Sequence, residues 1–371
     1  MRICYLADAA NIHTQKWVRY FAEEGHDVHL ISGSRFGTTD VPNVQLHVPW
    51  VVPGLRGGNL LLALAQVRHM IRRIRPDILH GHYATGGGFW GALCGFHPYV
   101  LTGWGSDVLI EPKASRLARW KAQFALKRAD ATTCDAEHFV QPMVDLGAVR
   151  ENVRLINFGI DTEKFHPRQR DDALRARFRG PAAGPVIMSL RMFAARYDID
   201  TFIRAVPLVL REFPDARFIA GGDGEQRQHL ETLAASLGVA DRVEFIGWVA
   251  NDDLPRYLAS IDVYVSTSLS DAGLANSTAE AMACERSVVI TDFGDNGKWV
   301  KDGEGGFLIP LRSPHALAEK LIVLLRDEGF RRRSGAVNRQ VIVERNDYHR
   351  EMAKVEALYE DLVGRAGRAK A

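Results

Sequence analysis

Short apolar runs alternate with longer amphipathic segments through the first 165 residues. The runs at residues 2–7, 27–31, 78–80, 99–102 and 131–134 predict strands, and residues 17–24, 60–74 and 117–128 predict helices. Gly25 ends the first of these helices, as glycine commonly does. Because strands and helices alternate, the pattern predicts a parallel sheet covered by helices on both faces.

The same rhythm resumes after residues 166–185, a segment rich in charge, proline and glycine. Strand-like runs follow at residues 186–190, 217–220, 243–246, 263–266 and 288–291, with helices in the intervals. The last helical segment, residues 348–363, has no strand after it. We therefore predict an α/β protein of two doubly wound domains, residues 1–165 and 166–347, followed by a C-terminal helix over residues 348–371.

Size and composition agree with this organisation. The 371 residues exceed one average domain, and 46% hydrophobic with 25% charged residues is typical of a soluble globular protein. The N-terminal run has the character of a first strand and not of a signal peptide, and the apolar stretch at residues 60–65 is far too short to cross a membrane. Cys4, Cys134 and Cys284 lie in apolar runs without CxxC spacing, which indicates reduced core thiols and a cytoplasmic protein.

The formal net charge of +2 gives no general reason to expect a nucleic-acid partner, and the basic residues form no stripe interleaved with aromatic residues. They do gather in two clusters, namely Arg68, Arg72 and Arg75, and Lys113, Arg116, Arg119 and Lys121. Two interpretations stay open for these clusters, a solvated helix face or peripheral contact with a membrane surface.

The loops after the strands of the second domain carry the richest candidate chemistry, because parallel sheets bind ligands at the carboxyl ends of their strands. Arg191 and Arg196 follow the first strand, and the glycine-rich segment 221–224 and Gly247 follow the next two. The segment 276–280, Asn-Ser-Thr-Ala-Glu, begins a helix. Arginines, glycines and a polar helix N-terminus suit a diphosphate, and a carboxylate on that helix suits ribose hydroxyls.

Each of these features also has a purely structural interpretation. Arg191 and Arg196 are alternatively surface charges, and the segment 221–224 is alternatively a tight turn. Ser277 and Glu280 have the spacing of a capping box, in which Glu280 satisfies backbone donors.

The first domain offers fewer candidates. His13 follows the first strand, and Asp107 ends the segment 103–107 after the strand at residues 99–102. A cleft contact, a helix-start role and a core role are all open for His13, and loop bracing is the alternative for Asp107. His80 and His82 have the spacing of metal ligands, but no carboxylate or cysteine cluster completes a set, so we predict no metal site.

Several ordered segments carry a family resemblance, namely residues 21–28, 157–161, 245–247, 276–284, 288–292 and 302–310. Together they span nearly the whole chain and resemble the retaining GT-B glycosyltransferases of family 4, the glycosyl transferases group 1. The resemblance implies two Rossmann-like domains facing across a cleft with a nucleotide sugar between them. It also implies an acceptor-side first domain, which the final helix joins, and a nucleotide-sugar-binding second domain.

The resemblance further implies a role for individual residues. Arg191, Arg196, Ser277 and Thr278 match the diphosphate-binding positions, Glu280 with Gly222 and Gly247 the ribose and base positions, and Asn276 the donor-sugar position. Two positions depart from the family pattern. Ala272 stands where the first of two glutamates is usual, which makes Asp271 the candidate sugar contact, and Trp104 stands where a histidine is usual. The catalytic candidates are therefore Asp107, Asp271 and His13.

The function implied by the resemblance is transfer of a sugar from a nucleotide-diphosphate sugar, such as a UDP-sugar, with retention of configuration. No cofactor or metal is implied. The implied acceptor is a lipid-linked or cell-surface glycan, with peripheral contact at the inner membrane surface. Two alternatives stay open. A nucleotide-sugar epimerase on the same fold would use a cleft acid or base, and a non-catalytic nucleotide-sugar-binding protein would account for Ala272 and Trp104.

Overall fold

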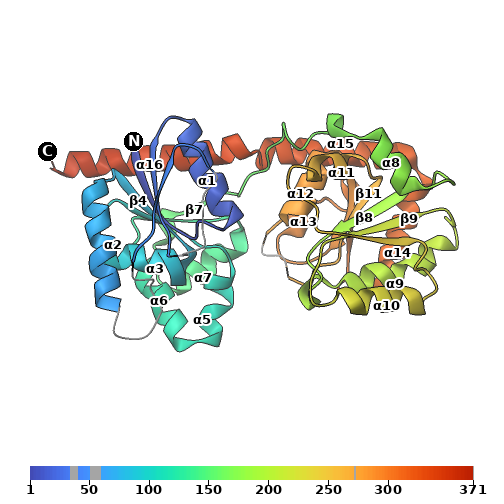
Figure 1. The fold of residues 1–371 in the computed structure, drawn as a ribbon, viewed down its shortest axis with the longest axis horizontal. Coiled ribbons are helices and arrows are strands. Elements are labelled where there is room, and N and C mark those ends of the chain that lie inside the picture. The colour runs from blue at the N-terminus through green and yellow to red at the C-terminus, as the bar shows by residue number, and fades with distance from the viewer. Residues whose placement is uncertain (34–40, 51–59, 271–272, 371) are drawn as a thin grey trace. The chain divides into compact units, whose positions relative to one another are not determined.

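The computed structural model describes residues 1–33, 41–50, 60–270 and 273–370. Contacts between residues divide the chain into two units (Figure 1). Unit 1 comprises Met1–Gly159 and His349–Ala371, and unit 2 comprises Ile160–Tyr348. The first change of unit therefore lies a few residues before the boundary predicted at residue 165.

Unit 1 is built on a sheet of seven parallel strands. In spatial order they are β3 (Val44–His47), β2 (Asp27–Ile31), β1 (Arg2–Leu6), β4 (Ile78–His82), β5 (Tyr99–Thr102), β6 (Ala131–Cys134) and β7 (Val153–Leu155). The central strands β1, β4 and β5 are almost wholly buried, and β1 and β5 have the near-continuous apolar sequences that are usual for strands covered on both faces, whereas β4 buries two histidines.

The helices of unit 1 cover both faces of this sheet. They are α1 (Ile12–Glu23), α2 (Leu60–Ile74), α3 (Gly88–Cys94), α4 (Ser106–Leu109), α5 (Glu111–Ala114), α6 (Arg116–Leu126), α7 (Val140–Asp145) and α16 (Tyr348–Lys370). The C-terminal helix α16 packs beside α1, where Tyr359 stacks on Phe21 with ring centres 5.1 Å apart. The hydroxyl of Tyr359 also lies 3.1 Å from the hydroxyl of Tyr5 on β1, so the last helix covers part of one face of the first sheet.

Unit 2 contains six parallel strands. In spatial order they are β10 (Val243–Gly247), β9 (Arg217–Gly221), β8 (Val186–Leu190), β11 (Val263–Ser266), β12 (Ser287–Thr291) and β13 (Gly306–Ile309). Alternate residues of one strand enter two separate apolar layers, as Ile187 and Met188 of β8 do. Both faces of the sheet are therefore core faces.

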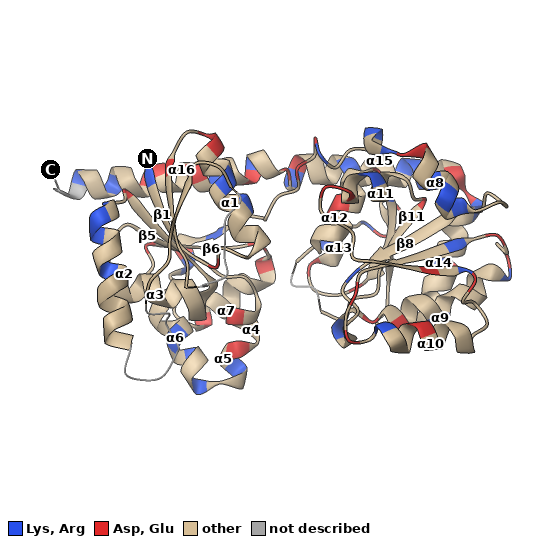
Figure 2. Cartoon of the chain, viewed as in Figure 1, with Lys and Arg blue, Asp and Glu red and all other residues tan. Residues whose placement is uncertain are grey.

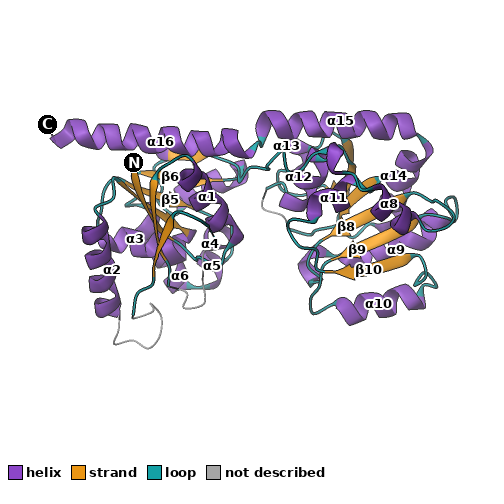
Figure 3. Ribbon diagram, turned by 45° about the horizontal axis from the view of Figure 1, so that its top comes forward, coloured by secondary structure: helices purple, strands orange, loops and turns teal. Residues whose placement is uncertain are grey.

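Each layer of unit 2 has its own helices, which flank the strands in Figure 3. The helices α9 (Ile199–Leu210), α10 (Arg227–Ser236) and α14 (Pro314–Arg326) cover one face. The other face is covered by α8 (Asp172–Arg179), α11 (Leu254–Ala259), α12 (Asn276–Ala283), α13 (Asn296–Trp299) and α15 (Glu328–Arg345).

The strands that the sequence pattern did not predict are β3, β7 and β13, and all three lie at the edge of a sheet. The strands β3 and β7 are short and partly solvated, so they lack the apolar run that marks a central strand, whereas β13 is a buried strand of four residues that begins with glycine. The helix predicted over residues 17–24 begins earlier, at Ile12. Asn11 caps it by accepting a hydrogen bond from the backbone N–H of His13 at 2.8 Å.

Candidate functional site

The order of strands reverses once in each sheet. In unit 2 the reversal lies between β8 and β11, and in unit 1 it lies between β1 and β4. Such a switch point leaves a crevice at the carboxyl ends of the two strands, because the loops that follow them turn to opposite faces of the sheet. A cavity lies at each switch point, and the two cavities have different linings.

The cavity of unit 2 has a volume of about 290 Å³. Among the residues predicted to bind a donor, its wall contains Arg191, Gly222, Asn276, Ser277 and Glu280. These residues come from the loop after β8, the loop after β9 and the first turn and a half of α12. The fold therefore brings most of the predicted donor site together.

Arg191 lies at the centre of this group. Its guanidinium Nη1 is 3.5 Å from Ser277 Oγ, and its guanidinium carbon lies 4.4 Å from the centre of the Tyr197 ring. Arg196 stacks on the same ring at 4.8 Å, but it is exposed and does not line the cavity. An arginine held against an aromatic face retains its charge and its planar set of donors for an anion.

The N-terminus of α12 opens into the cavity without a side-chain cap. The residue before the helix is Ala275, and the first helical hydrogen bond runs from Ala279 N to Ala275 O at 3.0 Å. The backbone N–H groups of residues 276–278 therefore precede the helical ladder. Ser277 lies inside the helix, and its hydroxyl accepts a hydrogen bond of 2.7 Å from Tyr264. The capping-box interpretation of Ser277 and Glu280 is wrong, since the cap position lies two residues before Ser277.

Gly222 shapes the cavity floor, and it contacts a second glycine, Gly247. Gly222 has φ +131°, and a Cβ atom there would lie 2.1 Å from the carbonyl oxygen of Arg191. Its N–H donates to the carbonyl of Gly247 at 2.7 Å. Gly247 itself lies beside the cavity and not in its wall. These contacts bring the ends of three strands close together, which a side chain at Gly222 would prevent.

The remaining predicted donor residues lie elsewhere. The Thr278 side chain is buried, so only its backbone faces the helix N-terminus. Asp271 and Ala272 lie outside the described residues. Sequence reasoning missed Tyr197, Asn251 and Trp248, which also line the cavity. Trp248 is 74% exposed directly after the glycine that ends β10, and an exposed tryptophan at a strand end was the signal available.

In unit 1, Asp107 is fully buried and supports the loop around it. One carboxylate oxygen accepts a hydrogen bond of 2.6 Å from Ala84 N, and the other accepts one of 2.9 Å from Trp104 N. Burial raises the pKa of the Asp107 carboxyl to about 6, although the two backbone donors act in the opposite direction. This placement supports the loop-bracing interpretation and not contact with a substrate.

His13 belongs to an aromatic cluster in unit 1. Its ring stacks on Phe158 at 4.4 Å and meets Trp104 edge-on at 5.7 Å. Burial, with a smaller contribution from Lys16, lowers the pKa of His13 to about 4. Its Nδ1 and both ring nitrogens of the buried His82 have no hydrogen-bond partner among the described residues. The imidazole of His13 is therefore neutral near pH 7 and has an unused polar atom.

His80 is occupied by the fold. Its Nδ1 is hydrogen-bonded to the hydroxyl of Tyr359, and its Nε2 lies 2.7 Å from Thr102 Oγ1. Within the described ranges, no three or more histidine, cysteine, aspartate or glutamate side chains are grouped as metal ligands. No helix in the described part of the chain is both long and apolar enough to span a membrane.

Two family models match the chain, one for each half. Residues 2–136 match the model described as Glycosyl transferase 4-like, and residues 184–327 match the model described as Glycosyl transferases group 1. The matched ranges include the strands of both switch points, β1 with β4 and β8 with β11.

Individual relatives agree with the models. The chain is 29% identical over 290 residues to the lipopolysaccharide core biosynthesis glycosyltransferase LpsE of Rhizobium meliloti. The match covers 76% of this chain and 75% of LpsE. It is 24% identical over 364 residues to the N-acetyl-alpha-D-glucosaminyl L-malate synthase of Bacillus anthracis. That match covers 93% of this chain and 92% of the synthase.

Among solved structures, HepE of Anabaena in complex with UDP has the same fold. The TM-score is 0.81 at 17% identity, over 98% of this chain and all of HepE. Neither the epimerase nor the binding-protein alternative is favoured, since the relatives are a transferase and a synthase. This protein belongs to the glycosyl transferases group 1, family 4 of the glycosyltransferases with the GT-B fold.

Proposed function

We propose that this glycosyltransferase transfers a sugar from a nucleotide-diphosphate sugar to a glycan or lipid-linked acceptor with retention of configuration. The observation that carries the proposal is the convergence of Arg191, the amides of residues 276–278 and Glu280 on one cavity at a switch point. A cation and a helix N-terminus together suit a diphosphate, and a nearby carboxylate suits ribose hydroxyls. HepE, which shares the fold, was crystallised with UDP.

In this proposal Arg191 binds the diphosphate directly. Arg196, whose guanidinium also stacks on the Tyr197 ring, adds positive charge nearby. Ser277 and Thr278 contribute backbone N–H groups, and Glu280 binds the ribose. Gly222 and Gly247 allow the ribose and base to approach the backbone. Asn276 contacts the donor sugar together with Asp271, which we assign from the sequence alone.

The reaction we propose has one bond-forming and one bond-breaking event on the same face of the sugar. The acceptor hydroxyl oxygen bonds to the anomeric carbon while the bond from that carbon to the β-phosphate oxygen breaks. The nucleoside diphosphate leaves with the electron pair, and the hydroxyl proton passes to the leaving phosphate. Arg191 and the amides at the start of α12 stabilise the negative charge that develops there.

Unit 1 is the acceptor side in this proposal. His13 is the side chain that we assign to the reacting groups, because the residue is only half-buried and its Nδ1, although itself buried, has no partner among the described residues. Asp107 instead positions the loop that carries Trp104, through the hydrogen bond to the Trp104 N–H.

We further propose a cytoplasmic enzyme that makes peripheral contact with the inner membrane surface. Leu60, Leu61 and Leu62 at the start of α2 are 51%, 78% and 62% exposed. Arg68 and Arg72 lie exposed further along the same helix, and basic residues also mark α6 (Figure 2). Exposed apolar residues beside basic ones are typical of surfaces that contact anionic lipid. LpsE, whose name places it in lipopolysaccharide core synthesis, is consistent with such an acceptor.

The test begins with the donor. Thermal unfolding is followed with UDP, GDP, ADP and TDP, and the sugar conjugates of the nucleotide that binds are then tested as donors. A ligand at about a hundred times its Kd adds roughly 2.7 kcal/mol to the free energy of unfolding. The anomeric configuration of the product, read by NMR, tests retention. An inverted product would contradict the mechanism, and binding without turnover of any donor would contradict the activity.

A further inference from the structure

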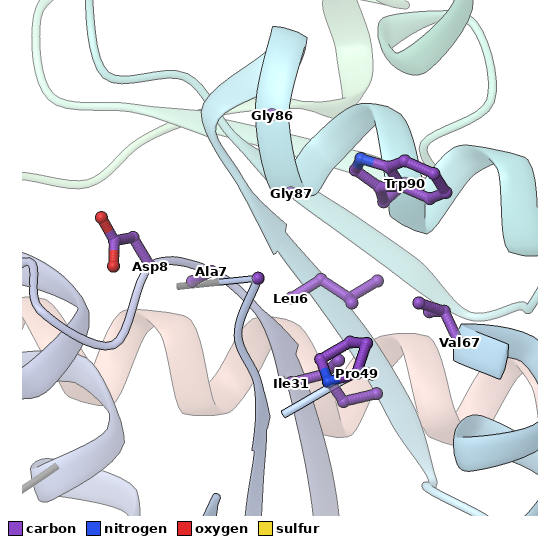
Figure 4. Close-up of a pocket in the computed structure, with 10 residues that line it drawn as sticks. Leu6, Ala7, Asp8, Ile31, Pro49, Val67, Gly86, Gly87 and Trp90 are labelled. Atoms are coloured by element: carbon purple, nitrogen blue, oxygen red, sulfur yellow. The ribbon is translucent and has the colours of Figure 1, made fainter. Parts of the chain in front are cut away.

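The cavity of unit 1 has a volume of about 270 Å³ and lies at the switch point between β1 and β4. Its apolar wall consists of Leu6, Ile31, Pro49, Val67 and Trp90, which come from both sides of the crevice (Figure 4). Most of the residues assigned to the donor line the cavity of unit 2, so the cavity of unit 1 has no part in the proposed donor site. It occupies in unit 1 the position that the donor cavity occupies in unit 2.

The described lining of this cavity offers no positive charge for a phosphate. Among the residues that the structure describes, Asp8 is the one ionisable residue of the wall, and the wall positions besides the five apolar ones are alanine and glycine. Asp8 is exposed at the rim, and its carboxylate points away from Leu6 and Pro49 in Figure 4. With no cation among its described wall residues, the cavity does not favour an anion, and the Asp8 carboxylate repels one at the entrance. The described wall therefore favours an occupant that is uncharged and apolar where it enters.

The glycine-containing wall of the cavity is held in an unusual conformation. Residues Tyr83–Gly87 form a single π-helical turn, in which Tyr83 has φ +70°. The Tyr83 hydroxyl lies 2.8 Å from Ser106 Oγ, and Thr85 Oγ1 donates to Glu111 Oε2 at 2.6 Å. Strained backbone and π-helical turns persist where surrounding contacts enforce them, often at binding sites.

The end of that turn also meets β1 directly. A Cβ atom on Gly87 would lie 2.0 Å from the carbonyl oxygen of Leu6. The wall is therefore fixed against the strand end, with Asp107 bonded to Ala84 N behind it. A cavity with fixed walls binds its ligand without first having to order them.

We propose that this cavity binds an uncharged apolar group of the acceptor, either a ring or a short hydrocarbon segment. The inference rests on the proposed function, in which unit 1 is the acceptor side. An apolar cavity of about 150 Å³ holds a benzene molecule. The cavity of about 270 Å³ therefore accommodates one substituted ring or a short chain, and not a complete lipid tail. The sugar hydroxyl that receives the new bond lies outside it.

The probes are methyl, butyl and hexyl glucosides, titrated by calorimetry below their micelle concentrations. Each added methylene that enters the cavity is worth about 0.8 kcal/mol, or roughly a fourfold gain in affinity. We expect saturable binding that tightens from butyl to hexyl glucoside and no detectable binding of methyl glucoside.

Val67→Phe fills the cavity from α2 and should weaken hexyl glucoside at least tenfold. Trp90→Ala enlarges the cavity, so it should shift the preference toward octyl glucoside even if Val67→Phe fails to fold. The matched control is Val337→Phe on α15, where the valine is 37% exposed and lies in unit 2. This control should leave both affinities unchanged.

Binding of the four nucleoside diphosphates is measured in the same samples. The inference alone is overturned if nucleotide binds but hexyl glucoside binds no better than methyl glucoside, or if Val67→Phe and Trp90→Ala change neither affinity. Non-saturable uptake that grows with chain length in every variant overturns it as well, since that behaviour marks partition onto a surface. Failure of every nucleotide to bind overturns the proposed function, and the acceptor assignment with it.

Discussion

The two units repeat one architecture and differ in what they place at the same point of it. Each sheet reverses its strand order once, and each reversal holds a cavity of similar volume, about 270 Å³ in unit 1 and about 290 Å³ in unit 2. Unit 2 lines its cavity with Arg191, the start of α12 and Glu280. Unit 1 lines its cavity with apolar side chains and one rim carboxylate.

The sheet topology thus sets where each cavity lies, and the loops and helices around it set the chemical character of its lining. Each cavity has a glycine in its wall that lies too close to a backbone carbonyl to carry a side chain. Gly87 lies against the carbonyl of Leu6, at the end of β1, and Gly222 lies against the carbonyl of Arg191, directly after β8. In the function that we propose, the charge of the surrounding side chains makes the cavity of unit 2 the diphosphate side and leaves unit 1 with an apolar cavity.

The largest effects are expected from the two glycines. Gly222→Ala puts a methyl group 2.1 Å from a backbone oxygen at φ +131°, and Gly87→Ala puts one 2.0 Å from a backbone oxygen. Each should lower the free energy of unfolding by roughly 3 kcal/mol, because backbone atoms cannot move aside as side chains do. Gly222→Ala should also abolish nucleotide binding, whereas Gly87→Ala should leave it intact wherever unit 2 stays folded.

Gly367→Ala is the control for both substitutions. No atom lies within 4 Å of the added methyl group there, and the residue lies in α16, where alanine is a better helix former. Chemical denaturation and calorimetric titration of the three variants separate these outcomes. Equal loss of nucleotide binding in Gly87→Ala and Gly222→Ala would show that the cavities are not independent.

The next largest effect concerns the two arginines of the donor site. Arg191→Ala removes a charged group from the cavity wall, which should cost about 1.5–3 kcal/mol and weaken nucleoside diphosphate binding by roughly tenfold to a hundredfold. Arg196→Ala should weaken it less, because Arg196 is exposed and reaches the site only through Tyr197. Arg204→Ala, an exposed arginine on α9, is the control. If Arg196→Ala lowered the affinity for nucleoside diphosphate more than Arg191→Ala did, the diphosphate would bind outside the cavity.

The fold itself was largely predictable from the sequence, because buried parallel strands carry apolar runs that stand out from their surroundings. The edge strands β3, β7 and β13 escaped this criterion, since β3 and β7 are mostly solvated and Gly306 opens β13. The polar residues that line the cavity of unit 2 were identifiable from their places after strands. The apolar cavity of unit 1 was not, because Leu6, Ile31 and Val67 have the same pattern as core residues until the structure shows a space between them.

A smaller effect is expected from acid. Burial lowers the pKa of His13 to about 4 and that of His82 to about 3, so unfolding releases them to take up protons below pH 6.5. Each therefore removes up to about 1.4 kcal/mol of stability per pH unit as the pH falls from 6.5 toward 4. Asp107, with its pKa raised to about 6, acts in the opposite direction below pH 6 and offsets part of the loss.

Because these histidines lie in unit 1, the free energy of unfolding of that unit should fall by about 1–2 kcal/mol as the pH is lowered from 7.5 to 6. Unit 1 should therefore become sensitive to protease before unit 2. In unit 2 the pKa of His166 is also lowered by burial, but its ring is partly exposed. Limited proteolysis at the two pH values measures the difference. His13→Phe, which keeps a ring beside Phe158, should reduce the pH dependence, and equal sensitivity of both units would contradict this explanation.

Amide hydrogen exchange with and without each of UDP, GDP, ADP and TDP locates the nucleotide-binding unit. We predict that one nucleotide slows exchange in the first turn of α12 and in the loops after β8 and β9, around Arg191 and Gly222, while the cavity of unit 1 is unaffected. Protection centred on unit 1, or no protection by any of the four nucleotides, would contradict the assignment of unit 2 as the donor-binding unit.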